Sequence, residues 1–334
     1  MNNTSRQKDT WSPAIIDLHL HIDGSVPLLT AQYLAALQGI SIPPSLSELK
    51  HSMSALVACK DLNDYLDRFI LPCSLLHIRQ ALTICTADLL TLLHCQGLRY
   101  AELRFAPQKS CLKGLSQYEA TEAVLQAMQQ SPLPCGLIVS MMRGDDNQKE
   151  NLETIEVAKA LKERGVVAVD LAGAEALYPT SLFRDEFKRV RASGLPLIIH
   201  AGEAAGADSV KEAVRAGARR IGHGVRALED KEAMKMLVEN QVTLELCPTS
   251  NLNTAIFSRY EDYPLRPLME AGVHVSINTD NMTVSDTTLR NEWDLLINAL
   301  HLTRCEQQLI VSNTIDACFC SEELKNRLKT EELS

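Results

Sequence analysis

The sequence lacks any apolar run that approaches the ~18 residues needed to span a membrane. Its polar start, MNNTSRQKDTWSP, also lacks the apolar core of a secretion signal. There is no block of lysines and arginines, and the formal net charge is −9. A nucleic-acid surface needs clustered cations to bind phosphates. These absences argue against a membrane and against a nucleic-acid partner, and they make a cytoplasmic location the default expectation.

The ten cysteines are scattered, with no CxxC pair and no zinc-finger spacing. In a long chain without a secretion signal, cysteines are typically reduced. A buried free cysteine packs as a small apolar side chain. We therefore predict reduced core thiols rather than disulfides.

Apolar residues make up 46% of the 334 residues, which is enough to bury a large core. Eight short apolar runs each suit one β-strand, and amphipathic segments such as NLETIEVAKALKER lie between them. The runs span residues 15–25, 98–107, 135–142, 166–173, 195–203, 220–225, 242–251 and 273–280. Such alternation is typical of parallel strands joined by helical crossovers. We predict one α/β domain over residues 1–334, a (β/α)8 TIM barrel.

Roughly 75 residues separate the first predicted strand from the second, more than one crossover requires. We interpret residues 27–97 as a helical, lid-like insertion, and the end of the chain as a C-terminal helical tail. Within the insertion, Leu62, Tyr65, Leu66 and Phe69 share one helical face, which either packs on the barrel or covers its mouth. A doubly wound open sheet is the alternative fold. No GxGxxG motif follows the first strand, which argues against a dinucleotide-binding protein of that alternative fold.

Ionisable side chains interrupt the first predicted strand, IIDLHLHIDGS. Alternate residues of a strand share a face, so Asp17, His19, His21 and Asp23 point the same way. Four such groups on a packed face are costly unless a partner satisfies them. A bound cation would be such a partner.

Other predicted strands also end in polar residues. His200 and Glu203 close the fifth run, His223 lies in the sixth, and Asp280 ends the last. Barrel enzymes build their sites at these strand ends, so the side chains should converge at one mouth. Each residue alone has an ordinary explanation; Asp280, for example, suits a helix cap. Together, the imidazoles and the carboxylate indicate a site for Zn²⁺ or a similar metal.

The motifs DLHLHIDGS, HAGE, IGHG and NTD, in this order, resemble those of the adenosine deaminase family of the amidohydrolase superfamily. VDLAG and CPTSN fit the same pattern, and the resemblance runs from about residue 14 to residue 325. It implies an enzyme of purine salvage that hydrolyses adenosine and 2′-deoxyadenosine to inosine and 2′-deoxyinosine, with release of ammonia. A zinc-activated hydroxide would attack C6 of the purine, and no organic cofactor would be required.

The resemblance also implies a role for each matching residue. The zinc ligands would be His19, His21, His200 and Asp280. Glu203 would donate a proton to N1 of the purine, while His223 and Asp280 would position the hydroxide. The predicted catalytic residues are therefore Glu203, His223 and Asp280.

The residues expected to contact substrate are His21, Asp23, Gly173 and Asn281. Gly173 would donate its backbone N–H to N3, and Asp23 would bind the 5′-hydroxyl of the ribose. Relatives that act on free adenine tend to carry Glu at the position of Asp23, so Asp favours a nucleoside; its charge disfavours AMP. Asn281 replaces a second acid that contacts N7 in many members, and a neutral amide can donate to that nitrogen. The change leaves adenine or an N6-substituted adenosine as the alternative substrate.

Two further alternatives concern the metal and the class of protein. Many related hydrolases bridge two metals through a lysine on the fourth strand, but VVAVDLAG contains none, which favours one ion per chain. Fe²⁺ or Co²⁺ could replace Zn²⁺ on these ligands. A non-catalytic binding protein on the same fold is disfavoured, because the ligands, Glu203 and His223 are all present. The oligomeric state stays open.

Overall fold

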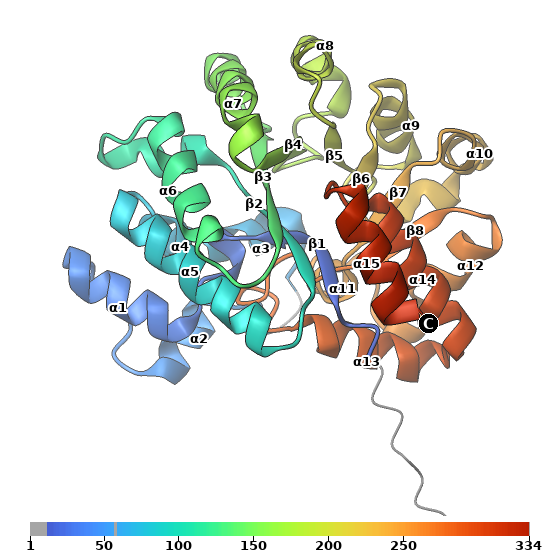
Figure 1. The fold of residues 1–334 in the computed structure, drawn as a ribbon, viewed down its shortest axis with the longest axis horizontal. Coiled ribbons are helices and arrows are strands. Elements are labelled where there is room, and N and C mark those ends of the chain that lie inside the picture. The colour runs from blue at the N-terminus through green and yellow to red at the C-terminus, as the bar shows by residue number, and fades with distance from the viewer. Residues whose placement is uncertain (1–11, 57–58, 334) are drawn as a thin grey trace, which may run out of the picture.

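The computed structural model describes residues 12–56 and 59–333, so residues 1–11 of the polar start lie outside the described residues. Eight strands alternate with helices in the described chain, as predicted (Figure 1). They are β1 (Ile16–His21), β2 (Tyr100–Phe105), β3 (Cys135–Met142), β4 (Val166–Ala172), β5 (Ile198–Ala201), β6 (Arg220–His223), β7 (Thr243–Leu246) and β8 (His274–Ile277). Each strand lies within one predicted run. The seventh run is cut short because helix α11 (Pro248–Asn253) begins at a proline, which suits a first helical position.

All neighbouring strands are parallel, and they pair in two sheets of order β1-β2-β3-β4 and β5-β6-β7-β8. Single bridges join the sheets at both edges, Val169 with Leu197 and Leu20 with Asp280. At the second edge, the backbone N–H of His21 donates to the carbonyl of Asp280 at 2.8 Å. The fold is therefore an α/β TIM barrel, as predicted.

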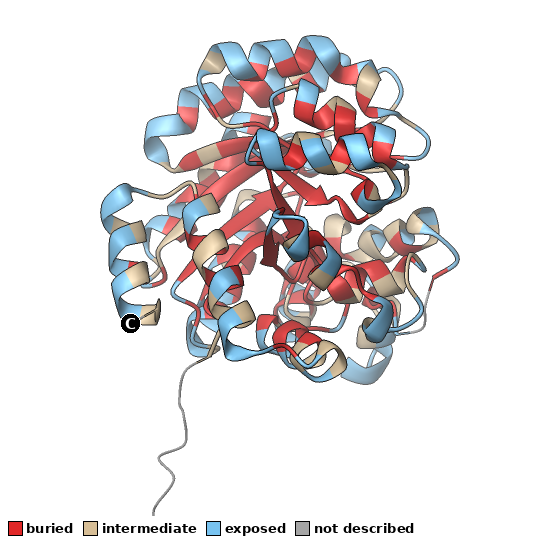
Figure 2. Ribbon diagram, turned by 90° about the vertical axis from the view of Figure 1, so that its right-hand side faces the viewer, coloured by how far each residue is buried: buried red, intermediate tan, exposed pale blue. Residues whose placement is uncertain are grey.

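Helices cover the outside of the strands, and Figure 2 shows that the strands are buried while the helices expose their outer faces. The outer helices between β2 and β8 are α6 (Gln117–Gln129), α7 (Gln148–Leu161), α8 (Arg184–Ser193), α9 (Ala207–Arg215), α10 (Lys231–Glu239) and α12 (Leu265–Glu270). After β8 come α13 (Leu289–Leu300), α14 (Arg304–Ala317) and α15 (Glu322–Leu333), and α14 packs on β8.

The described residues between β1 and β2 form the α-helices α1 (Leu28–Gln38), α2 (Leu46–Met53), α3 (Leu62–Leu66), α4 (Ile70–Ser74) and α5 (Arg79–Cys95). The last of them, α5, packs beside α6 in the outer layer, so it serves as the crossover between the first two strands. Tyr65 of α3 is buried against Val284, which follows β8, and Leu62 and Phe69 pack on this cluster. The predicted apolar face of α3 thus meets the loop after β8.

No single helix of the described chain combines the length and apolar composition of a membrane span. The segments Leu62–Ser74 and Arg79–Cys95 meet that criterion only when joined across a bend of 114°. All ten cysteines are free, as predicted. However, Cys95 and Cys305 are exposed, so the prediction of core thiols is wrong for these two.

Glu292 of α13 is a buried acid whose proton should link stability to pH. Its carboxyl accepts hydrogen bonds from the Thr249 N–H at 3.0 Å and the Thr287 hydroxyl at 2.6 Å. Burial nevertheless raises the pKa of Glu292 from 4.5 to about 7. The unfolded chain releases this proton near pH 4.5 and the folded protein near pH 7, so the free energy of unfolding should fall with rising pH across that window.

We expect Glu292→Gln to remove this pH dependence, because the amide keeps the shape of the side chain but carries no proton to lose. A shift of one pKa unit corresponds to ~1.4 kcal/mol. The free energy of unfolding of the wild type should therefore fall by on the order of 3 kcal/mol between pH 4.5 and 8 through this group. Urea unfolding of both proteins across this pH range measures it. Equal pH slopes for the two proteins would contradict the prediction.

Candidate active site

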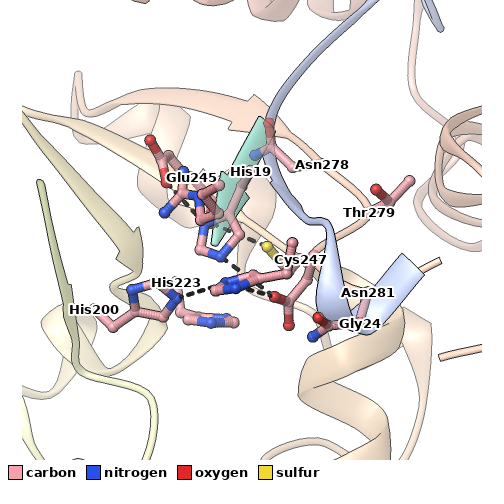
Figure 3. Close-up of polar contacts among 12 residues, drawn as sticks. His19, Gly24, His200, His223, Glu245, Cys247, Asn278, Thr279 and Asn281 are labelled. Atoms are coloured by element: carbon pink, nitrogen blue, oxygen red, sulfur yellow. Dashed lines mark hydrogen bonds and ion pairs between the residues drawn. The ribbon is translucent and has the colours of Figure 1, made fainter. Parts of the chain in front are cut away.

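The predicted site residues gather at the carboxyl ends of the strands, around a cavity of about 330 Å³. His19 and His21 lie on β1, His200 on β5 and His223 at the end of β6. Figure 3 shows His19, His200 and His223 close together. The cavity is lined by eight of the predicted residues, His21, Asp23, Gly173, His200, Glu203, His223, Asp280 and Asn281. Leu62, Tyr65, Leu66 and Phe69 of the insertion line it too. His19, the remaining predicted residue, is fully buried in the barrel.

A set of four buried side chains could hold a metal ion, since each offers a ligand atom within 4.8 Å of the others: His19, His200, His223 and Asp280. Nε2 of His19 is buried without a hydrogen-bond partner and lies 3.3 Å from Oδ1 of Asp280. His21 is outside this set, yet its Nε2 lies 3.3 Å from Nε2 of His200 and 3.5 Å from Oδ1 of Asp280. Nitrogens and a carboxylate oxygen that face one another at such separations fit a shared cation. All five side chains therefore qualify by position.

Two of the imidazoles are oriented by buried carboxylates. Oε2 of Glu245 lies 2.7 Å from Nδ1 of His19, and Oδ1 of Asp170 lies 3.1 Å from Nδ1 of His200. A carboxylate at Nδ1 keeps the proton there and leaves the lone pair of Nε2 for a metal. Neither acid is among the site residues predicted from the sequence, although each stands in a buried run, TLEL or VDLAG, where an acid needs a partner.

One guanidinium supports both carboxylates. Arg104 of β2 is fully buried, and its Nη2 lies 2.7 Å from Oε2 of Glu245 while its Nη1 lies 3.4 Å from Oδ2 of Asp170. Burial opposes ionisation of Glu245, but the charges of Arg104 and Arg220 hold its pKa well below the usual value. The pKa of Asp170 is also lowered despite burial, by the charges of His200 and Arg104. Both acids are therefore anions that can each fix an imidazole.

His223 has a different partner behind its ring. Its Nδ1 lies 3.0 Å from Nδ2 of Asn251, whose Oδ1 accepts a hydrogen bond from the Tyr263 hydroxyl at 2.9 Å. The amide therefore donates to Nδ1, and the neutral ring carries its proton on Nε2. Burial lowers the pKa of His223 to about 3, so the ring is neutral at pH 7. Its Nε2 lies 3.5 Å from Oε2 of Glu203, where it can donate.

Glu203 lies in the loop after β5. A second acid, Glu175, accepts hydrogen bonds from the backbone of this loop. The backbone N–H groups of Gly202, Glu203 and Ala204 donate to the carboxylate of Glu175 at 2.7, 3.0 and 2.8 Å. Burial, followed by the charges of Asp280 and Glu175, raises the pKa of Glu203 well above 4.5. The raised pKa favours the neutral carboxylic acid at Glu203, which is the form that can donate a proton. Glu175 could not be predicted as a site residue from the sequence, because only the fold brings its carboxylate to the backbone of this loop.

Two site residues adopt a backbone conformation that is uncommon outside glycine. His223 has φ 62° and Asp280 has φ 60°, each where the chain leaves a strand. Such left-handed residues are enriched at active sites, where the surrounding structure offsets their strain. Here the turn directs both side chains into the cavity that they line.

The predicted substrate-contacting residues lie around the same cavity. Asp23 follows β1, and burial raises its pKa to about 6. Gly173 follows β4 with φ 105°, a conformation that favours glycine. The amide nitrogen of Asn281 donates to the Tyr65 hydroxyl at 3.0 Å.

Comparison with known proteins agrees with this geometry. The profile of the family described as "Adenosine deaminase" matches residues 14–332. An "Adenosine deaminase" of Haemophilus ducreyi is 44% identical over 323 residues, 94% of each chain. Among solved structures, the adenine deaminase from Arthrobacter aurescens superimposes with a TM-score of 0.89 at 27% identity, over 96% of this chain and 98% of that one. The arabidopsis N6-mAMP deaminase MAPDA superimposes with a TM-score of 0.83 at 24% identity, over 95% and 97%.

A TIM barrel with histidines and an aspartate gathered at its strand ends defines an amidohydrolase-type enzyme. Within this class, the chain belongs to the adenosine deaminase family. The family resemblance seen in the sequence motifs is thus confirmed, and the protein is an enzyme of this family.

Proposed function

We propose that this enzyme hydrolyses adenosine and 2′-deoxyadenosine to inosine and 2′-deoxyinosine, with release of ammonia. One observation carries the proposal: Glu203, whose buried carboxyl has a raised pKa, and the neutral imidazole of His223 line the same cavity as the cluster suited to a metal. A proton donor, a hydrogen-bond donor and a cation are what hydrolysis at a purine C6 requires. The relative with 44% identity, named adenosine deaminase, supports the choice of substrate.

In this proposal His19, His21, His200 and Asp280 hold one divalent metal. His223 is left out of the ligand set, although its position allows it, because Asn251 places the imidazole proton on Nε2. Three imidazoles and a carboxylate suit Zn²⁺. Such an ion, when bound, would act as a Lewis acid that lowers the pKa of water, so that a strong nucleophile is available near neutral pH.

The remaining catalytic roles follow from protonation states. Glu203 donates its proton to N1 as negative charge develops on the ring, which is typically worth ~10²–10⁴-fold in rate. His223 donates its Nε2–H to the attacking water oxygen and holds it beside C6. Burial opposes the charge of Asp280, but its contacts with His19 keep the pKa of Asp280 below 3.8, so an anion remains that can accept the proton of that water.

The substrate-contacting residues favour a nucleoside in this proposal. With a pKa of about 6, Asp23 is mostly ionised at pH 7; it can accept a hydrogen bond from a 5′-hydroxyl and repels a 5′-phosphate. Gly173 offers its N–H to N3, and Asn281 faces N7. Free adenine and N6-substituted adenosine remain the alternative substrates, since enzymes named for adenine and N6-mAMP share the fold.

A substrate panel tests the proposal. We expect kcat/KM, measured by formation of the 6-oxopurine product, to be highest for adenosine and 2′-deoxyadenosine. It should be at least tenfold lower for adenine, which lacks the 5′-hydroxyl that bonds to Asp23, and for AMP, whose phosphate Asp23 repels. N6-methyladenosine, which would release methylamine instead of ammonia, tests the N6-substituted alternative. Asp23→Asn should reduce the preference for adenosine over AMP, because the repelling charge is gone. Faster turnover of adenine or AMP by the wild type would overturn the proposal.

A further inference from the structure

A tyrosine of the insertion contacts the site through its hydroxyl. Tyr65 of α3 is 2% exposed, and its hydroxyl oxygen accepts a hydrogen bond from Nδ2 of Asn281 at 3.0 Å. The same oxygen lies 2.7 Å from Oγ of Ser285. One hydroxyl therefore links a helix that precedes β2 to the loop that follows β8.

The other end of the Asn281 amide is confined as well. Its Oδ1 is buried without a hydrogen-bond partner. It lies against Gly24, where an added Cβ would come within 1.8 Å of it (Figure 3). The amide is thus held between two groups. The Tyr65 hydroxyl accepts a hydrogen bond from one of its N–H groups. On the other side, Oδ1 lies so close to Gly24 that no residue larger than glycine would fit at position 24.

This confinement decides what Asn281 can offer to a ligand. An amide nitrogen carries two N–H groups, and Tyr65 uses only one of them. Asn281 also lines the cavity. The residue is therefore set to donate to an acceptor atom of the ligand.

We propose that Tyr65 is a positioning residue that holds the Asn281 amide in place as a donor to the ligand, so that the site selects bases with an acceptor nitrogen at the purine N7 position. The proposal rests on the proposed function. Without the hydroxyl, the Asn281 side chain loses this hydrogen bond and can move away from the position in which it donates to such a nitrogen. Tyr65 would then govern base specificity although its own hydroxyl bonds to protein groups.

The test compares adenosine with 7-deazaadenosine, in which a CH group replaces N7. We expect the wild type to prefer adenosine by about tenfold in kcat/KM, the worth of one good hydrogen bond. Tyr65→Phe should reduce this preference to less than threefold, mainly by lowering kcat/KM for adenosine. Asn281→Ala should have the same effect. The double variant should show no further change, because both substitutions remove the same hydrogen bond from the Asn281 amide to the ligand.

Tyr263→Phe is the matched control, since Tyr263 is also 2% exposed and its hydroxyl also bonds to an asparagine amide. It should lower kcat/KM for both substrates by the same factor and leave the preference at its wild-type value. A wild-type preference retained in Tyr65→Phe, or an equal loss on both substrates, would overturn the proposal.

Equilibrium binding of inosine and 7-deazainosine, measured by calorimetry, tests the role of Tyr65 separately from the proposed deaminase activity. If adenosine is not turned over but inosine binds tighter and Tyr65→Phe abolishes that difference, the proposed function fails and the role of Tyr65 stands. If the wild type binds the two ligands equally, the role of Tyr65 fails whether or not adenosine is a substrate.

Discussion

Replacing Glu203 with glutamine should lower kcat for deamination by ~10²–10⁴-fold, the usual worth of general acid catalysis, and leave the metal content unchanged. Glutamine fits the same space and can still donate a hydrogen bond, but it cannot transfer a proton. Glu203 suits that transfer because burial and the neighbouring charges of Asp280 and Glu175 raise its pKa well above 4.5.

The same pKa fixes the sign of the pH dependence. The neutral form of Glu203 is the active one, so wild-type kcat/KM should decline as the pH rises through its raised pKa. Glu203→Gln should lack this decline. A pH profile of both proteins, with elemental analysis of the metal, measures the two effects. Glu239→Gln, at an exposed position on α10, is the matched control and should behave as the wild type. Activity of Glu203→Gln within tenfold of the wild type would remove Glu203 from its proposed role.

Replacing Arg104 with methionine should destabilise the fold and weaken metal binding together. Arg104 contacts both Glu245 and Asp170, and all three are fully buried. Removing the cation leaves the buried Asp170 without a guanidinium and Glu245 with Arg220 alone, and one broken buried pair typically costs ~3–5 kcal/mol. Each anion also orients a histidine, and loss of such support typically lowers metal affinity by ~10–100-fold.

Denaturant unfolding and competition with a chromophoric chelator measure the two effects of Arg104→Met. Arg220→Met is the matched control, because Arg220 is equally buried and pairs with Glu102 and Glu245 but not with Asp170. It should lose comparable stability and less metal affinity, since the Asp170–His200 contact stays supported. Wild-type affinity in Arg104→Met would show that the guanidinium has no part in the metal site.

The strands and the main site residues could be predicted from the sequence because both depend on local patterns. Short apolar runs that alternate with amphipathic helical segments suit buried strands, and parallel strands bring their carboxyl ends to one mouth. His200, His223 and Asp280 stand at such ends, so their convergence did not require knowledge of any side-chain contact.

The residues that tune the site could not be predicted, because their contacts depend on the register between distant strands. Glu245 meets His19 across 226 residues of sequence, and Arg104 meets Glu245 across 141. Likewise, the proton on Nε2 of His223 depends on Asn251 and Tyr263, which follow the next strand. The insertion illustrates the same limit: nothing local distinguishes α5, which packs in the outer layer, from α3, which reaches the cavity.

Metal content and ammonia release, measured on one preparation before and after chelation, test the central claim most directly. The account predicts about one divalent ion per chain, loss of adenosine deamination when that ion is removed, and recovery on addition of Zn²⁺. Thoroughly metal-free protein that still deaminates adenosine at its original rate would contradict it.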